Sequence, residues 1–400
     1  MGIRRQVDNL EIKKRIAILG TRGIPAHYGG FETFAEELSV RLLQHGVDVT
    51  VYCEKGEGAL QDKYLGVNLV HILAPRLGPL TTIIFDLVCL WHARKDFDVV
   101  YMLGYGTSIF CFLPRIWGTE VWINMDGVEW ARSKWGKLAR MWFKGMESVA
   151  MWTPNCLIAD AYGILQHLQS RHNHLPPVRV ISYGAKVVSD APDKGVLNEW
   201  QLTSGQYYLV VCRIEPENSV KMIVKGYLKS TTNFPLVVVG EVDAARKYVS
   251  ELLHLNDGRI RFIGSVYDKS KLQALRFYAL TYFHGHTVGG TNPSLLEALG
   301  CGSVVIAHDN EFNQEVAGET AEYFSSENDI ATKIHEIESC PMERLFHMKS
   351  CAQNRISKAY SWDGIANAYL ELLEYSRKEQ FVIKYRQLNE GYENNRIKQV

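Results

Sequence analysis

The sequence predicts an α/β protein made of two Rossmann-like domains with a cleft between them. Its 400 residues are more than one ordinary hydrophobic core accommodates, so two domains are expected. Short apolar runs alternate with amphipathic helical patterns, which is typical of parallel sheets covered by helices on both faces. The alternation stops in a polar connector at 184–205 and restarts near Tyr207, so each half is expected to form its own sheet.

The expected strands are the short apolar runs. They cover 16–20, 47–53, 67–73, 99–104, 121–125, 156–159 and 178–182 in the first half, and 207–214, 236–240, 260–264, 279–283 and 304–307 in the second. Phe34, Leu38 and Leu42 recur with the helical period between the first two runs, and Gly46 ends that pattern.

Three segments are expected along the chain. Residues 1–187 would form the acceptor-side domain and 188–365 the donor-binding domain. The last segment, 366–400, belongs to a helix expected over 362–378 and a polar tail, and it would return to the N-terminal domain.

Composition excludes several classes of protein. Lys plus Arg equals Asp plus Glu at 44 each, so no overall positive field recruits nucleic acid. The eight cysteines show no CxxC spacing, which argues against a zinc or redox motif and favours reduced cytosolic thiols. The first fourteen residues have no apolar core, so a signal peptide is not expected.

The first candidate site is the glycine-rich loop 20–30, which joins an apolar strand to an amphipathic helix. Glycines allow backbone amides to approach a ligand, and the positive end of the following helix favours an anion. The spacing differs from GxGxxG, so a nicotinamide dinucleotide is not the expected ligand. The alternative is a turn that only reverses the chain.

Two charged segments follow strands, one in each half. Asp126 lies in 124–130, where ligands of open α/β sheets bind and where a carboxylate can accept a proton or bind sugar hydroxyls. Arg213 follows the first strand of the second half and is suited to a bidentate diphosphate contact. The alternatives are a simple Asp-Gly turn and a surface arginine paired with Glu215 or Glu217.

The most specific segment is 284–300, in which a strand leads through a glycine-rich loop into a helix. Pro293 stands where proline is favoured, in the first helical turn, so the free amides of that turn point at the loop and suit a diphosphate. Glu297, one turn further on, could accept hydrogen bonds from a ribose diol. His284 and His286 lack an acidic third ligand nearby, so we expect core or cleft histidines and no metal site.

Taken together, these segments resemble the retaining GT-B glycosyltransferases of glycosyltransferase family 4. The resemblance covers residues 15–362 and rests on four motifs in order: GTRGIPAHYGGFE (20–32), DGVEW (126–130), RIEPEN (213–218) and GGTNPSLLE (289–297). As a set they are similar to a bacterial branch that includes rhamnosyltransferases of capsule and O-antigen synthesis. The resemblance implies that a sugar is moved from a nucleotide to a glycan, first L-rhamnose from dTDP-rhamnose and otherwise glucose, galactose or mannose.

The resemblance also implies residue roles, with neither a cofactor nor a divalent metal. Arg213 would clamp the diphosphate and Glu297 would hold the ribose. Asp126 stands where many relatives have a histidine beside the donor sugar, and it is the expected catalytic residue. The remaining expected donor contacts are glycines and polar residues of the two loops: Gly29, Gly30, Gly289, Gly290, Thr291 and Asn292.

Two positions depart from the family pattern. Gly289 stands where relatives carry the first of two glutamates, and Asn218 stands where they carry a phosphate-binding lysine. The sugar-binding details of relatives therefore do not transfer to this chain. Lys221 could supply part of the missing positive charge.

The stretch 132–152 is basic and rich in tryptophan. Its basic members are Arg132, Lys134, Lys137, Arg140 and Lys144, interleaved with Trp135, Trp142, Phe143 and Trp152. Such a pattern is typical of a helix on a membrane surface, and the alternative is a solvated basic face over an aromatic core stripe. Because acceptors in this family are often sugars on polyprenyl diphosphate carriers, the resemblance favours a cytoplasmic enzyme peripheral to the inner face of the membrane.

Other activities use the same architecture. A nucleotide-sugar epimerase would turn over the donor without transferring it, and a non-catalytic sensor would bind the donor with no turnover. A glycogen-type phosphorylase would need a lysine-bound pyridoxal phosphate, which we do not expect here.

Overall fold

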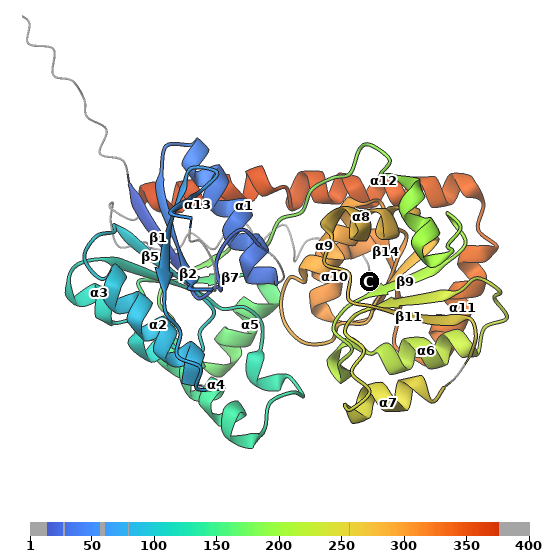
Figure 1. Cartoon of the computed structure of the whole chain (residues 1–400), viewed down its shortest axis with the longest axis horizontal. Helices are drawn as coiled ribbons and strands as arrows, with labels where there is room; N and C mark the ends of the chain where they lie inside the picture. Colours follow the sequence, from blue (N-terminus) through green and yellow to red (C-terminus); the bar gives the residue numbers. More distant parts are fainter. Residues whose placement is uncertain (1–13, 27–28, 57–60, 79, 256, 376–400) are drawn as a thin grey trace, which may run out of the picture.

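The computed structural model describes residues 14–26, 29–56, 61–78, 80–255 and 257–375. It has two lobes side by side, each a sheet with helices on both faces (Figure 1). This architecture confirms the predicted fold class. His27 and Tyr28 of the glycine-rich loop, the N-terminal segment before 14, and the last residues of the helix expected over 362–378 with the tail that follows it lie outside the described residues.

The N-terminal lobe is built on an eight-stranded sheet in the order β3-β4-β2-β1-β5-β6-β7-β8. All neighbouring strands are parallel except β3 and β4, which are antiparallel. The strands are β1 (Arg15–Leu19), β2 (Asp48–Glu54), β3 (Lys63–Tyr64), β4 (Val67–Ile72), β5 (Val99–Leu103), β6 (Glu120–Asn124), β7 (Cys156–Ala159) and β8 (Val178–Val180).

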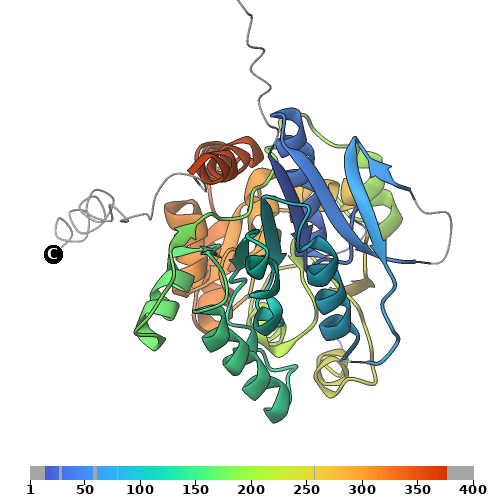
Figure 2. The same cartoon turned by 90° about the vertical axis from the view of Figure 1, so that its left-hand side faces the viewer.

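Helices cover both faces of this sheet because its strands are apolar on both sides. The helices of the lobe are α1 (Gly30–Gln44), α2 (Leu80–Ala93), α3 (Leu113–Ile116), α4 (Lys137–Ala150) and α5 (Tyr162–Arg171). Apolar residues of α1 join one core, and those of α2, α4 and α5 join the core on the opposite face. Figure 2 views this lobe from its free end, with α2 and α4 below the sheet.

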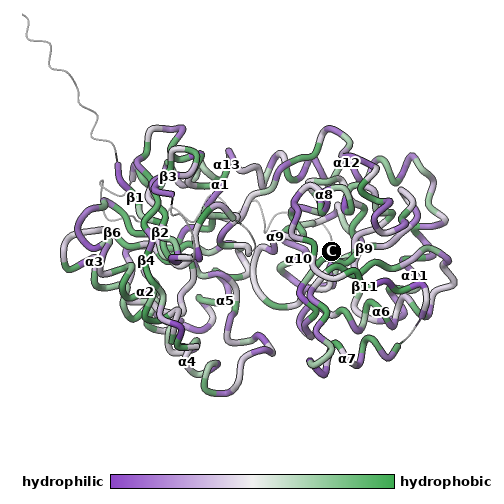
Figure 3. Tube along the Cα trace, viewed as in Figure 1, coloured by the Kyte–Doolittle hydropathy of each residue, from purple (hydrophilic) through white to green (hydrophobic). Residues whose placement is uncertain are grey.

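The C-terminal lobe is built on a six-stranded parallel sheet in the order β11-β10-β9-β12-β13-β14. Its strands are β9 (Tyr208–Val211), β10 (Leu236–Val239), β11 (Ile260–Gly264), β12 (Thr281–His284), β13 (Val305–His308) and β14 (Ala321–Phe324). Its helices are α6 (Val220–Leu228), α7 (Lys247–Leu253), α8 (Lys269–Tyr278), α9 (Pro293–Gly300), α10 (Glu311–Ala317), α11 (Glu327–Glu338) and α12 (Met342–Ala359). Figure 3 shows the apolar residues concentrated in the strands of the sheets.

The last described helix, α13 (Trp362–Tyr375), leaves the C-terminal lobe and lies along the top of the N-terminal one (Figure 1). Its Tyr369 is fully buried, where the phenol hydroxyl lies 2.7 Å from that of Tyr101 on β5 and the ring packs edge-on against Phe34 of α1. The chain therefore crosses between the lobes twice.

The expected strands are all present, and two strands were not expected. Both β3 and β14 are edge strands, with a neighbour on one side only. Their short sequences, KY and AEYF, carry charged residues and have no continuous apolar run. Among the described residues, no helix is both long and apolar enough to cross a membrane. All eight cysteines lie in the described part of the chain and are free thiols.

Candidate active site

A cleft of about 1530 Å³ lies between the lobes and is lined by residues of both. Loops at the carboxyl ends of β1, β6, β9 and β12 reach it, as expected for open α/β sheets. The structure brings all of the predicted site residues to its walls: Gly29, Gly30, Asp126, Arg213, Gly289, Gly290, Thr291, Asn292 and Glu297.

The N-terminus of α1 forms one wall, and Glu32 holds the glycine-rich loop in front of it. The Glu32 carboxylate accepts hydrogen bonds from the Arg22 amide (3.1 Å) and the Thr21 hydroxyl (3.3 Å). Gly29 has φ 124° and lies so close that a Cβ there would be 1.9 Å from Glu32 Oε2. The loop therefore requires glycine at this position, and its backbone stays close to the cleft.

The N-terminus of α9 faces the N-terminus of α1 from the C-terminal lobe. Asn292 caps this helix by accepting a hydrogen bond from the Ser294 amide (2.9 Å), and Pro293 occupies the first turn, as predicted. A Cβ built on Gly30 would lie 3.5 Å from Pro293 Cγ. Two positive helix ends therefore meet across the cleft, where they favour an anion.

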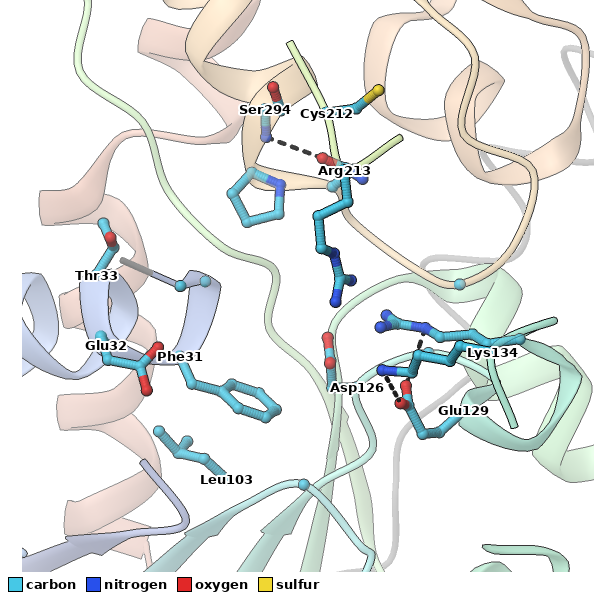
Figure 4. Close-up of a pocket in the computed structure, with 18 of the residues that line it drawn as sticks. Phe31, Glu32, Thr33, Leu103, Asp126, Glu129, Lys134, Cys212, Arg213 and Ser294 are labelled. Atoms are coloured by element: carbon cyan, nitrogen blue, oxygen red, sulfur yellow. Dashed lines mark hydrogen bonds and ion pairs between the residues drawn. The ribbon is translucent and has the colours of Figure 1, made fainter. Parts of the chain in front are cut away.

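Arg213 extends from the end of β9 into the cleft toward Asp126 (Figure 4). Its side chain is 46% exposed and only distantly paired with Glu215, at 4.0 Å. The guanidinium is thus available to a ligand and is not held as a surface ion pair.

Asn218 fixes the turn that presents Arg213. Its amide donates to the Arg213 carbonyl oxygen (2.7 Å), and its Oδ1 lies 2.8 Å from Nδ1 of His286. The proposed substitute cation, Lys221, forms an ion pair with Glu251 at 2.6 Å and does not line the cleft. That expectation was wrong, because Lys221 is directed toward Glu251 and away from the cleft.

Asp126 lies on the opposite wall, where Tyr183 donates a hydrogen bond to its Oδ1 (3.1 Å). Burial raises the pKa of the Asp126 carboxyl above its ordinary value, and the nearby guanidinium of Arg132 opposes that shift. Gly127 has φ +64°, and a Cβ on it would lie 3.1 Å from the Cα of Gly289. Position 289, where relatives carry a glutamate, therefore lies at a close contact between the lobes, where Gly127 and Gly289 touch.

A second cationic group, made by Arg132 and Lys134, also lines the cleft. Glu129 holds both residues, with ion pairs of 2.9 Å to Arg132 and 3.1 Å to Lys134, as Figure 4 shows for Lys134. Both residues belong to the stretch 132–152, whose sequence pattern predicts a membrane surface. Their spacing of three and five residues from Glu129 was the signal that could have assigned them to the cleft.

Glu297 is 43% exposed and forms an ion pair of 2.7 Å with the buried Arg276. This partner lies on α8 and was not predicted, because it is brought close only by the packing of α8 on α9. The pair fixes one carboxylate oxygen of Glu297 at the cleft wall.

His284 and His286 both line the cleft, and burial lowers the pKa of each ring below its ordinary value. The pKa of His286 falls to about 4, because the positive charges of Arg132 and Arg213 add to the effect of burial. Both rings are therefore neutral near pH 7. Within the described ranges, no group of three or more His, Cys, Asp or Glu side chains is arranged to hold a metal ion.

Asp160, at the end of β7, is a buried residue that sequence reasoning missed. Its Oδ2 accepts from the Thr291 amide (2.9 Å), and its carbonyl oxygen accepts from the Thr291 hydroxyl (2.5 Å). Burial and the neighbouring Asp126 raise the pKa of Asp160 well above its ordinary value. The residue thus links the N-terminal lobe to the loop in front of α9.

Two family profiles match the chain. Residues 13–186 match a domain of unknown function, DUF1972, and residues 199–355 match the glycosyl transferases group 1. The C-terminal lobe belongs to the group 1 glycosyltransferases. Enzymes of this group are retaining hexosyltransferases. No curated protein sequence matches it.

Solved structures show the same GT-B fold as this glycosyltransferase. Sucrose-phosphate synthase from Thermosynechococcus elongatus has 16% identity and a TM-score of 0.75, over 90% of this chain and 98% of that one. HepE from Anabaena, in complex with UDP and glucose, has 14% identity and a TM-score of 0.72, over 90% and 99% of the two chains. Trehalose-6-phosphate synthase from Burkholderia multivorans has 11% identity and a TM-score of 0.70, over 90% and 96%.

Proposed function

We propose that the cleft binds a nucleoside diphosphate sugar with its diphosphate between the N-termini of α1 and α9, and that Arg213 clamps that diphosphate. The observation that carries this proposal is the convergence of the two helix ends, with Gly30 and Pro293 in near contact and Arg213 extending into the same cleft. Backbone amides at a helix end and an arginine fork are well suited to phosphate oxygens.

The same groups would lower the barrier to transfer. Negative charge develops on the departing diphosphate, and fixed donors aimed at that charge stabilise the transition state. Asp126 lies opposite Arg213 and would bind the donor sugar or assist removal of the proton from the attacking hydroxyl. Attack from the same face as the leaving group would retain the configuration without a protein nucleophile.

The ribose would be held by Glu297. Its carboxylate already uses one oxygen for Arg276, and it is exposed enough to accept hydrogen bonds from a diol. Gly289, Gly290, Thr291 and Asn292 would supply backbone contacts around the donor.

We propose dTDP-L-rhamnose as the first donor to test, because the four motifs together resemble rhamnosyltransferases. HepE is a protein of the same fold that has been captured with UDP-glucose. UDP-glucose, UDP-galactose and GDP-mannose are therefore the comparison donors.

The proposed acceptor is a glycan on a polyprenyl diphosphate carrier, met at the inner face of the membrane. Support comes from α4, which presents Lys137, Arg140 and Lys144 together with the exposed Leu138 and Met141. Cationic and apolar side chains on one helix suit an anionic membrane surface.

A thermal-shift screen of these four donors tests the proposal. A donor present at 100 times its Kd should stabilise the wild-type enzyme by about 2.7 kcal/mol. Arg213→Gln and Glu297→Gln should lose most of that shift, because each removes a charged contact worth about 1.5–3 kcal/mol. Lys221→Gln, which lies outside the cleft, is the matched control and should keep it.

A turnover assay with the same donors separates the competing activities. Release of nucleotide only when an acceptor is added supports a transferase. Epimerisation of the sugar without an acceptor, or binding of every donor with no turnover on any acceptor, would contradict it. If no nucleotide sugar shifts the melting temperature, the proposed donor site is wrong.

A further inference from the structure

One end of the cleft is unused by the donor scheme and lies wholly within the N-terminal lobe. Its walls come from α2, from the loop after β5 and from α4, and we call it the α2/α4 recess. The residues that define it are Phe85, Asp86, Thr107, Leu138, Trp142 and Phe143.

The floor of the recess is polar. Asp86 is only 4% exposed, yet it lines the cleft, and its Oδ2 accepts a hydrogen bond of 2.8 Å from the Thr107 hydroxyl. Burial raises the pKa of this carboxyl to about 7. Burying a carboxyl in an apolar wall costs free energy unless a polar group binds it. Because Asp86 faces the cavity, its position indicates that a polar group of a ligand binds there.

The wall opposite α2 is aromatic and held in place. The Trp142 indole donates to the Gly106 carbonyl oxygen (2.9 Å), and the rings of Trp135 and Phe143 lie 5.0 Å apart. A Cβ on Gly106 would lie 3.1 Å from Phe143, so the loop packs directly on α4. Rigid aromatic faces beside a single carboxyl form the mostly apolar pocket, with few polar groups, that is typical of small-ligand sites.

The mouth of the recess is apolar and exposed. Leu138 is 83% exposed and Met141 is 68% exposed on the first half of α4, and Leu80 is 55% exposed at the start of α2. Leu138 and Met141 neighbour Lys137 and Arg140 along the first half of α4, so the surface beside the recess is both apolar and cationic. Large exposed apolar side chains around a pocket mark a binding surface.

We infer that the α2/α4 recess binds the acceptor as an amphipathic glycoside, with a sugar hydroxyl against Asp86 and an apolar aglycone leaving over Leu138 and Met141. This inference rests on the proposed transferase function and names the chemistry of its second substrate. Asp86 is a specificity residue here, because it would bind the acceptor and take no part in bond breaking.

Calorimetric titration of matched methyl and octyl glycosides tests the inference. The pairs carry glucose, galactose, mannose or rhamnose, and they are added below the micelle concentration to enzyme saturated with nucleoside diphosphate. For at least one sugar, the octyl glycoside should bind at least about 10-fold more tightly than the methyl glycoside, because burial of about two methylene groups suffices for that factor.

Three variants resolve the parts of the recess. Asp86→Asn keeps the shape of the floor and should weaken both members of the pair by about 10- to 100-fold. Leu138→Ser changes an exposed residue and should remove only the advantage of the octyl chain. Trp91→Ala is the control, because Trp91 lies on the same helix but packs against Trp117 with ring centroids 5.6 Å apart.

The outcomes distinguish this inference from the proposed function. Three outcomes would overturn the recess assignment. They are equal binding of methyl and octyl glycosides, no binding of any pair, and an equal loss of glycoside affinity in Asp86→Asn and Trp91→Ala. Nucleotide-sugar binding measured in the same samples reports separately on the donor site. Donor affinity should be unchanged in all three variants.

Discussion

Asp126 is the side chain on which the proposed chemistry depends most directly. It faces Arg213 across the cleft, and Tyr183 orients its carboxylate through a hydrogen bond of 3.1 Å. Burial raises its pKa, which increases the basicity of the ionised form. A carboxylate with these properties suits a group that takes a proton or holds a sugar hydroxyl.

Replacing Asp126 by Asn keeps the shape and removes the charge. If the carboxylate assists proton removal, kcat should fall by about 10²- to 10⁴-fold. The affinity for the nucleoside diphosphate should change little, because the proposed diphosphate contacts come from Arg213 and the helix ends. Steady-state kinetics and calorimetry on the same preparation measure the two effects.

Tyr183→Phe is the companion variant, because it removes the orienting hydrogen bond and leaves the carboxylate. It should lower kcat less than Asp126→Asn does. Near-normal turnover in Asp126→Asn would reduce Asp126 to a turn residue, and joint loss of folding and donor binding would indicate a structural role.

At the scale of elements, the two ends of α4 have different tasks. Its C-terminal end carries Glu147, whose side chain is 1% exposed and accepts hydrogen bonds from Trp130 (2.7 Å) and Arg171 (2.8 Å). His167 and His172 of the α5 region also contact this carboxylate. Although burial favours its neutral form, these partners lower the pKa of Glu147 to about 2.

Because the folded pKa of Glu147 is depressed, its stabilising effect is present above the unfolded value of about 4.3 and is lost as the pH falls toward 2. Glu147→Gln should therefore lower the free energy of unfolding by roughly 2–3 kcal/mol at pH 7. The difference from wild type should shrink below about pH 4. Urea unfolding of both proteins at several pH values measures this difference in unfolding free energy. A difference that is constant with pH would contradict a depressed pKa of Glu147.

The exposed basic side chains of α4 are the part of 132–152 that remains available to a membrane. Lys137, Arg140 and Lys144 lie on this helix, whereas Arg132 and Lys134 are held at the cleft by Glu129. The membrane test therefore concerns three of the five basic residues.

Changing Lys137, Arg140 and Lys144 together to Gln should weaken binding to vesicles containing anionic phospholipid. Each residue near such a surface contributes about 1 kcal/mol, so the loss should be large at low salt and small at high salt. Changing Lys221 and Lys225 of α6, together with Lys229 directly after it, to Gln gives the same change of net charge on the other lobe. Vesicle co-sedimentation should separate the two triple variants, and equal loss in both would contradict a specific surface on α4.

At the scale of the whole molecule, polar contacts between the lobes surround the cleft. Glu315 on α10 accepts from the amides of Tyr162 (2.6 Å) and Gly163 (3.0 Å), so a carboxylate of one lobe caps α5 of the other. Asp160 holds Thr291, and Ser133 donates a hydrogen bond to Glu217. These contacts fix the distance between the helix ends that would share the diphosphate.

The proposed positive charge at the diphosphate comes from Arg213 and the ends of α1 and α9. Turnover should therefore persist when EDTA chelates divalent cations. The measurement is nucleotide release with and without excess EDTA, with Mg²⁺ and Mn²⁺ added back. Complete loss in EDTA and recovery with either metal would count against this arrangement of the site.

The sequence by itself determined where the internal strands lie and where α9 begins. Apolar runs specified the internal strands, and the cap at Asn292 with Pro293 specified the start of α9, because these features depend on neighbours in the chain. The rule that ligands bind beyond the carboxyl ends of parallel strands then assigned Asp126 and Arg213 to one cleft.

Only the tertiary structure decided which side chains meet. Arg276 with Glu297, Asp160 with Thr291 and Glu315 with the start of α5 are pairs joined by packing, and no local pattern links their members. The same is true of Lys221. Its position in the sequence suggested that it could replace the lysine missing at 218, whereas the orientation of α6 directs it to Glu251. Partner choice depends on the orientation of whole helices, because a side chain reaches only what its helix face is packed against.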